Sequence, residues 1–104
     1  MGGTGRRLRR FLVSDRSMEP TLHAGQGLIA WRSSRSRVGQ LRCIEHPGRP
    51  DFWLVKRVHD MPTTSTNDVR SDNTEIDTVD SATFGPVPVD GSYRVLLAIP
   101  LRWM

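Results

Sequence analysis

The sequence predicts an all-β fold, mainly antiparallel, whose short strands curl into a small barrel-like sheet. Seven prolines and nine glycines interrupt the 104 residues, and no long stretch carries the 3.6-residue apolar spacing of a helix. Apolar or alternating runs of strand length recur instead, each bounded by turn-forming residues. Because 37% of the residues are hydrophobic and 25% are charged, a single small domain with a modest core is expected.

Five runs have the length and composition of strands. They are residues 11–13, 28–31, 41–45, 52–59 and 93–99. Between the last two, residues 61–70 are rich in Thr, Ser, Asn and Asp and predict a hairpin or loop. Gly85-Pro86-Val87-Pro88 predicts a rigid extended turn, because proline fixes φ and restrains the residue before it.

Residues 1–10 are rich in glycine and arginine and predict a flexible basic tail, so a single domain is expected to span 11–104. The formal net charge is +4, and the excess lies mainly in this tail and in Arg32-Ser33-Ser34-Arg35-Ser36-Arg37. Such clusters suit nucleic acid, an anionic membrane surface or an acidic partner, but a solvated tail and loop are the simpler interpretation. No apolar run approaches the ~20 residues of a transmembrane helix. A soluble, cytoplasmic chain is therefore expected, with peripheral membrane contact through the basic end as the alternative.

Cysteine and histidine usage predicts no metal site. Cys43 is the only cysteine, which excludes an intrachain disulfide and a zinc cluster of thiolates, and its apolar surroundings predict a buried, inert thiol. His23, His46 and His59 lie on three different segments without short ligand spacing, as scattered surface histidines do.

Two side chains have the chemistry of a nucleophile and its base. Ser17 begins a turn that contains a proline, and Lys56 lies inside an apolar run. Only apolar residues share the strand face of this lysine, namely Phe52, Leu54 and Val58. If that face is the core, lost hydration lowers the pKa of the amine, and a base near neutral pH needs a drop of roughly three units from about 10.4. From these residues alone, a lysine that reaches the surface and a serine that caps a turn or helix remain open alternatives.

Three ordered sequence boxes resemble those of type I signal peptidases. The nucleophile box corresponds to Ser17-Met18-Glu19-Pro20-Thr21-Leu22, and the general-base box corresponds to Val55-Lys56-Arg57-Val58. The last box corresponds to Ser71-Asp72-Asn73 with Thr78-Val79-Asp80-Ser81 and Gly85-Pro86-Val87-Pro88. Together with Val38-Gly39-Gln40 they cover most of residues 12–88. LexA-type repressors share this Ser/Lys catalytic domain, but their nucleophile box lacks the Met-x-Pro-Thr continuation. The resemblance implies a β sheet of the signal peptidase/LexA catalytic-domain type.

The resemblance also implies a serine endopeptidase with a Ser/Lys dyad. Ser17 would attack a peptide carbonyl, its backbone N–H would stabilise the oxyanion, and neutral Lys56 would take the proton. The supporting residues would be Thr78, which orients the lysine amine, Asp72 and Asp80, which fix the loop behind it, and Met18 of the nucleophile box. An acyl-enzyme would form and water would release it, with no metal or cofactor.

Within that family, the nickel-type superoxide dismutase maturation proteases are the most similar in size and soluble character. The stretches Phe84-Gly85-Pro86-Val87-Pro88 and Arg102-Trp103 also resemble this subgroup. The implied function is removal of an N-terminal leader or propeptide from a protein precursor.

Several positions depart from the family pattern. Asp15 stands where many relatives carry a serine that completes the oxyanion hole, and a carboxylate there would repel the oxyanion unless it points away. Ser71 replaces a glycine. Ala82 replaces an arginine that usually pairs with the equivalent of Asp80, so this carboxylate must find backbone donors or water. Acidic residues common after glycine are replaced by Gln26 and Gln40.

Two other functions compete with the peptidase hypothesis. A catalytically weak relative would bind a peptide or a partner through the same groove. A basic nucleic-acid-binding β module would instead use loop arginines and stacking tryptophans. Its candidate residues are Arg32, Arg35, Arg37, Trp31 and Trp53.

Overall fold

The computed structural model describes residues 7–100, which form one open antiparallel sheet of seven strands. The strands are β1 (Leu8–Leu12), β2 (Gly27–Arg32), β3 (Leu41–Glu45), β4 (Trp53–Thr63), β5 (Thr66–Arg70), β6 (Val87–Pro88) and β7 (Tyr93–Ala98), with one helical turn, α1 (Ser81–Phe84), between β5 and β6. Their order in the sheet is β1-β2-β7-β3-β4-β5-β6. The predicted all-β, mainly antiparallel fold is therefore confirmed.

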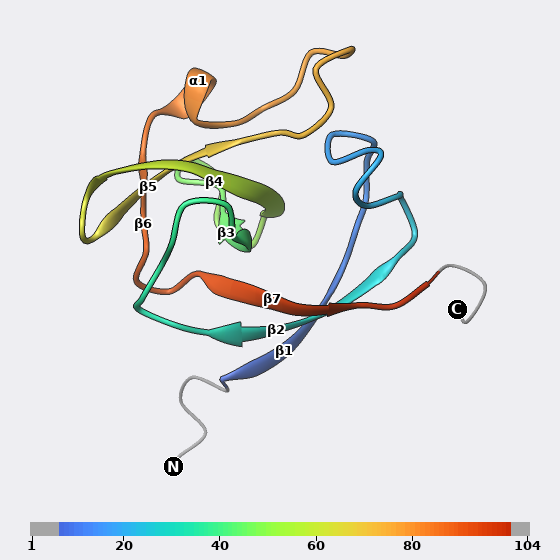
Figure 1. Ribbon diagram of the computed structural model, residues 1–104, viewed down its shortest axis with the longest axis horizontal. Coiled ribbons are helices and arrows are strands. Elements are labelled where there is room, and N and C mark those ends of the chain that lie inside the picture. Colours follow the sequence, from blue (N-terminus) through green and yellow to red (C-terminus); the bar gives the residue numbers. More distant parts are fainter. Residues whose placement is uncertain (1–6, 101–104) are drawn as a thin grey trace.

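The sheet bends strongly but does not close into a barrel. In Figure 1, β1, β2 and β7 run across the lower part of the molecule, and β4, β5 and α1 lie above them. The two halves meet where β3 pairs with β7 over only two register positions, Arg42 with Arg94 and Cys43 with Tyr93. Strands β1 and β6 are the edges of the sheet, and within residues 7–100 no pairing joins them.

The first strand begins earlier than the sequence analysis predicts. Residues 8–10 were expected to belong to a flexible tail, but they pair with residues 29–31 of β2. Arg9 lies over the rings of three aromatic side chains, 4.8 Å from the centroid of Phe11, 4.7 Å from that of Trp53 and 5.8 Å from that of Tyr93. This cation–π packing holds an arginine-rich segment on the sheet. Residues 1–6 and Arg102-Trp103 lie outside the described residues.

The core consists of two apolar clusters, and the neighbouring residues Cys43 and Ile44 of β3 belong to one each. One contains Met18, Leu28 and Cys43 under the aromatic residues of β1, β4 and β7, and the other contains Ile44 and Val69. Burial raises the pKa of the Cys43 thiol to about 12, as an inert core thiol requires. The sole helix of residues 7–100 is the single turn α1, and none there is long and apolar enough to cross a membrane.

Two cations are buried side by side in the sheet. Arg42 of β3 and Lys56 of β4 are register partners, with exposed fractions of 0% and 1%. Arg42 donates to Ser92 Oγ at 3.0 Å, and its other donors reach Gln40 Oε1 and the main-chain oxygens of Ser33, Arg35 and Ser92. This network fixes the basic loop between β2 and β3 against the core.

Candidate active site

Three segments that are distant in sequence meet around Ser17. The loop after β1 carries the serine, β4 carries Lys56, and the segment 71–73 follows β5. Asn73 fastens the first and third segments, because its N–H donates to Ser17 O at 2.8 Å and its Nδ2 donates to Arg16 O at 2.9 Å. The nucleophile box and the last box, as defined from the sequence, are thus directly bonded to each other.

The serine turn is anchored by the residue that follows the nucleophile candidate. Met18 is fully buried in the larger core cluster, and its Sδ accepts a hydrogen bond from the N–H of Asp72 at 3.3 Å. Met18 O accepts from Leu22 N at 2.9 Å, which closes the turn. Ser17 is 5% exposed as a result, held at the edge of the core.

Lys56 occupies a core-facing position, which is one of the two alternatives that its strand pattern left open. Leu54 and Val58, two residues to either side, are also buried, so the alternative of a lysine that reaches the surface is wrong. Burial lowers the pKa of the amine, and the charges of Asp15 and Asp80 oppose this only in part. An amine with a lowered pKa is available in its neutral, proton-accepting form at lower pH than an exposed lysine.

The hydroxyl that Lys56 contacts is Ser71 rather than Thr78. Lys56 Nζ donates to Ser71 Oγ at 2.7 Å. Thr78 lines the same cleft, but within residues 7–100 no hydrogen bond joins it to the lysine. The resemblance to type I signal peptidases sets a glycine at this position, so it could not assign Ser71 this contact. The pairing of Arg57 with Arg70 in the β4–β5 hairpin was the signal, because it places Ser71, the residue directly after β5, beside Lys56.

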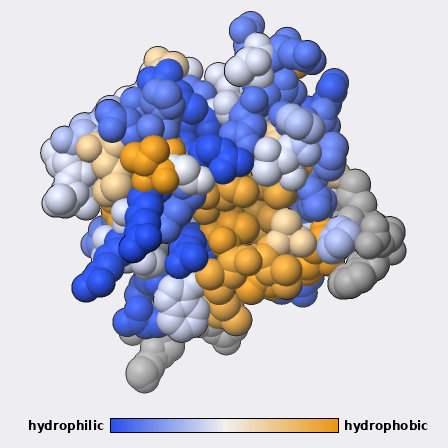
Figure 2. All heavy atoms as spheres, viewed as in Figure 1, coloured by the Kyte–Doolittle hydropathy of each residue, from blue (hydrophilic) through white to orange (hydrophobic). Residues whose placement is uncertain are grey.

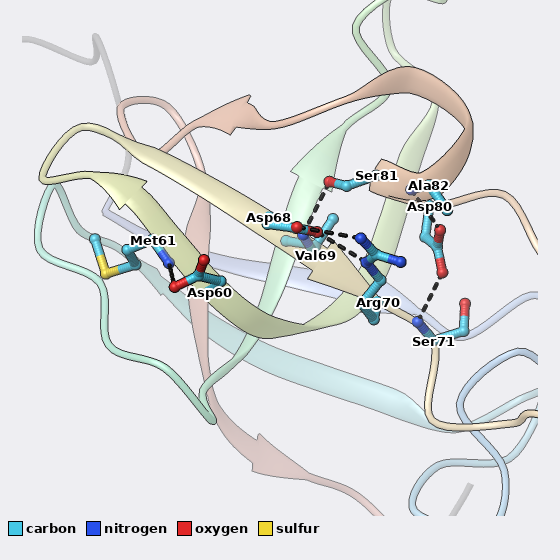
Figure 3. A network of polar contacts seen from close by, with 9 residues as sticks. All are labelled: Asp60, Met61, Asp68, Val69, Arg70, Ser71, Asp80, Ser81 and Ala82. Carbon is cyan, nitrogen blue, oxygen red and sulfur yellow. Dashed lines mark hydrogen bonds and ion pairs between the residues drawn. The ribbon is translucent and has the colours of Figure 1, made fainter.

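Asp80 holds the segment that carries Ser71. Its Oδ2 accepts from the N–H of Ser71 at 3.1 Å, and its Oδ1 accepts from the N–H of Ala82 at 2.9 Å, which caps α1 (Figure 3). Ser81 Oγ accepts from Val69 N at 2.9 Å and joins the same turn to β5. With alanine at position 82, Asp80 finds backbone donors, as the sequence analysis requires.

Asp72 connects all three segments. Arg57 donates to it twice, from Nε at 2.8 Å and from Nη2 at 2.7 Å, and Thr21 Oγ1 donates at 2.6 Å. The hydrogen bonds from Arg57 hold the pKa of the Asp72 carboxyl below its usual value. Asp72 therefore ties the serine turn to the lysine strand by a charge-assisted fork.

Asp15 lies against the serine instead of pointing away. Its Oδ1 accepts from the N–H of Ser17 at 2.9 Å. Partial burial acts to raise the pKa of this carboxyl, but hydrogen bonds from Ser17 and the charge of Lys56 outweigh it, so the pKa lies below the usual value. The backbone donor expected to stabilise an oxyanion is thus bonded to a carboxylate in this structure.

Ser17 opens onto two depressions. The larger, of about 250 Å³, also contains Lys56 and lies between the β3–β4 loop and residues 76–79. The smaller, of about 30 Å³, lies between the end of β1 and the beginning of β4 and is mainly apolar. Figure 2 shows apolar atoms gathered on the viewed face, between β4 and the β1–β2–β7 part of the sheet. Within residues 7–100 no direct hydrogen bond joins Ser17 Oγ to Lys56 Nζ.

The structure brings the predicted site residues into one region. Ser17, Lys56 and Thr78 line one cleft, while Met18, Asp72 and Asp80 support its walls from behind. Ser71 is the added member.

No family model and no curated protein sequence matches this chain.

Proposed function

We propose that this chain is a Ser/Lys endopeptidase of the type I signal peptidase kind, which removes an N-terminal leader or propeptide from a protein precursor. The observation that carries the proposal is a buried serine and a buried lysine in one cleft, where the three sequence boxes meet. Burial lowers the pKa of Lys56, as a general base requires. The open antiparallel sheet would then be of the signal peptidase/LexA catalytic-domain type.

In the proposed reaction, neutral Lys56 takes the proton of the Ser17 hydroxyl as Ser17 Oγ attacks the peptide carbonyl. The carbon–nitrogen bond breaks, the lysine passes the proton to the leaving amine, and an acyl-enzyme remains. Water then attacks the ester, again with Lys56 as base, and releases the serine. Because Lys56 Nζ is bonded to Ser71, the lysine turns toward Ser17, or exchanges the proton through a water, when substrate binds.

An oxyanion at the attacked carbon requires the N–H of Ser17, which Asp15 occupies. Asp15 is partly exposed, so a substrate carbonyl that enters the cleft can displace its side chain toward solvent. A donor of this kind is typically worth about 3 kcal/mol in the transition state. Displacement of Asp15 is therefore part of the proposed binding step.

The two depressions beside Ser17 support an extended peptide substrate. The smaller, about 30 Å³, admits only a small side chain next to the serine, which agrees with the small-residue preference that the family resemblance implies. The larger cleft accepts a bulkier neighbour. A leader-type precursor with small residues at the cleaved bond fits this arrangement, and a nickel-type superoxide dismutase precursor is one candidate because residues 84–88 resemble the maturation proteases.

Labelling of the nucleophile tests the proposal. A peptidase-directed acylating inhibitor is incubated with the protein, and peptide mapping by mass spectrometry locates the adduct. We expect an adduct on Ser17 that is lost in Ser17→Ala and Lys56→Ala. Ser14→Ala is the matched control, because Ser14 is exposed in the smaller depression and plays no part in the reaction. An adduct on Ser14, or one that persists in Lys56→Ala, would sink the Ser/Lys mechanism.

Cleavage of candidate precursors, followed by N-terminal sequencing of the product, tests the substrate class. Wild type is expected to shorten the precursor and Ser17→Ala to leave it intact. A second function, a catalytically weak peptide-binding domain, is favoured by the bond between Asp15 and the Ser17 N–H. Peptide binding without any acylation of Ser17 would decide for that alternative.

A further inference from the structure

One wall of the larger cleft carries two donor side chains that the proposed mechanism leaves unused. Arg49 and His46 lie in the loop between β3 and β4 and line the cleft together with Ser17 and Lys56. The guanidinium of Arg49 lies over the ring of Phe52, 4.1 Å from its centroid. This stacking holds the guanidinium at the cleft wall and leaves its edge, which carries the donors, uncovered.

The donors of this wall have no acceptor within residues 7–100. No hydrogen bond or ion pair involves the Arg49 guanidinium there, and the neighbouring carboxylate of Glu45 instead accepts from Asp51 N at 2.7 Å. His46 Nδ1 accepts from Gly48 N at 3.0 Å, so neutral His46 carries its proton on Nε2. Contacts with Phe52 and Phe84, at 6.0 and 5.1 Å between ring centroids, fix the imidazole. The wall thus presents a cation and an N–H donor in fixed positions.

The carboxylates of the cleft form no ion pair with this wall within residues 7–100. Asp15 is bonded to the N–H of Ser17 and interacts with the charge of Lys56. Asp77 belongs to the facing segment, where Ile76 and Val79 are exposed apolar side chains, 39% and 44% accessible. The cleft is therefore cationic along the β3–β4 loop, and its other wall combines exposed apolar side chains with the carboxylate of Asp77.

We propose that Arg49, assisted by His46, binds an acidic side chain of the substrate near the cleaved bond. This inference rests on the proposed peptidase function and specifies its substrate class: a precursor with Asp or Glu within reach of the cleft. A guanidinium edge matches a carboxylate in geometry and charge, and the apolar surroundings reduce competition from water.

Binding of matched peptides tests the inference without any cleavage reaction. A fluorescent peptide series, with small residues at the intended cleavage bond, carries Glu or Gln at each flanking position in turn. Binding to Ser17→Ala is measured by anisotropy at physiological ionic strength, where distant charges are screened. We expect Glu to bind about tenfold more tightly than Gln at one position. Arg49→Ala in the Ser17→Ala background should abolish the difference, and Arg49→Glu should favour Lys at that position.

Arg37→Ala is the matched control, because Arg37 is an exposed arginine on the β2–β3 loop and does not line this cleft. Equal Glu and Gln binding at every position, or an equal effect of Arg37→Ala, would overturn the inference. Cleavage by wild type separates the two proposals. Peptides that are cleaved without a Glu preference overturn the acidic subsite alone, and peptides that bind with the preference but are never cleaved overturn the peptidase function alone.

Discussion

Two buried cations are register partners on neighbouring strands of the sheet, but their hydrogen-bonding environments differ. Arg42 is surrounded by acceptors, five of which receive hydrogen bonds from its guanidinium. Among the described residues, Lys56 has one acceptor, Ser71 Oγ. Burial lowers the pKa of both, but that of Arg42 only to about 10, so the arginine stays charged at neutral pH. The arginine is stabilised as a charge by its acceptors, whereas burial of the lysine, with its pKa lowered, is offset by far fewer hydrogen bonds.

The difference shows how the same strand pair serves structure and chemistry. The guanidinium cannot give up its proton near neutral pH, so its neighbours must supply the hydrogen bonds that water would have made. An amine can escape the same cost by deprotonation. In the proposed mechanism, the poorly solvated lysine lies in one cleft with Ser17, and this tendency is directed toward the hydroxyl.

Lys56→Met is expected to have the largest effect. Methionine keeps the length and apolar stem of lysine but cannot take a proton, so kcat/KM for a cleaved precursor should fall about a thousandfold. The midpoint of urea unfolding should stay the same or rise, because a poorly solvated amine is removed from the core. A large loss of stability in this variant would show that Lys56 is a structural cation like Arg42.

Arg42→Met should produce the converse result. Removal of the guanidinium leaves several buried carbonyl and hydroxyl acceptors without donors, at a cost of about 3 kcal/mol in the free energy of unfolding. Urea denaturation measures this loss. The stability of Arg42→Lys, which keeps the positive charge but only part of the hydrogen bonding, should lie between those of wild type and Arg42→Met. Activity per folded molecule should change little. A stability equal to that of wild type would show that the network around Arg42 contributes nothing.

Ser71→Ala tests whether the hydroxyl of Ser71 influences the pKa and the orientation of the Lys56 amine. The protonated amine loses its acceptor, which disfavours the charged form further, so the acid limb of the kcat/KM profile should move to lower pH. The rate on the plateau should fall about tenfold, because the amine is less well oriented. Thr78→Val is the comparison variant, since Thr78 lines the cleft but, in the described part of the chain, makes no hydrogen bond to the lysine. The family-based assignment would be restored if Thr78→Val showed these changes and Ser71→Ala did not.

The sequence predicted the sheet where side-chain alternation reflects burial. Strands β2, β3, β4 and β7 fall within a few residues of their expected positions, because their apolar faces are continuous. The start of β1 was missed because Arg9 stands where an apolar residue is expected, and its stacking on three rings is a tertiary contact. The turn α1 was missed because a four-residue helix depends on one cap, Asp80, rather than on periodicity.

The candidate site was predictable in its two principal members and not in their immediate partners. Strand alternation put apolar residues on the face of Lys56 but left a lysine that reaches the surface as an open alternative, and only the resemblance of the ordered boxes favoured a core-facing lysine paired with Ser17. Ser71 could be found only from the register of the β4–β5 hairpin, which depends on how the chain turns after residue 63. The bond from the Ser17 N–H to Asp15 had a local signal, because an aspartate often accepts from the N–H two residues later.

The smallest expected effect concerns Asp15, which bears on Lys56 but not on Arg42. Asp15→Ser frees the N–H of Ser17 and removes a negative charge that raises the pKa of Lys56, so kcat/KM should rise and its acid limb should move to lower pH. The gain should be roughly threefold, because the carboxylate is partly exposed and screened. Asp15→Asn removes the charge but keeps an acceptor, and should recover only part of the gain.

Asp77→Asn is the control, since Asp77 lines the same cleft and is not among the charges acting on Lys56. Lower activity in Asp15→Ser would mean that the carboxylate holds the serine in place for reaction, and the view of Asp15 as an occupant that substrate must displace would be wrong.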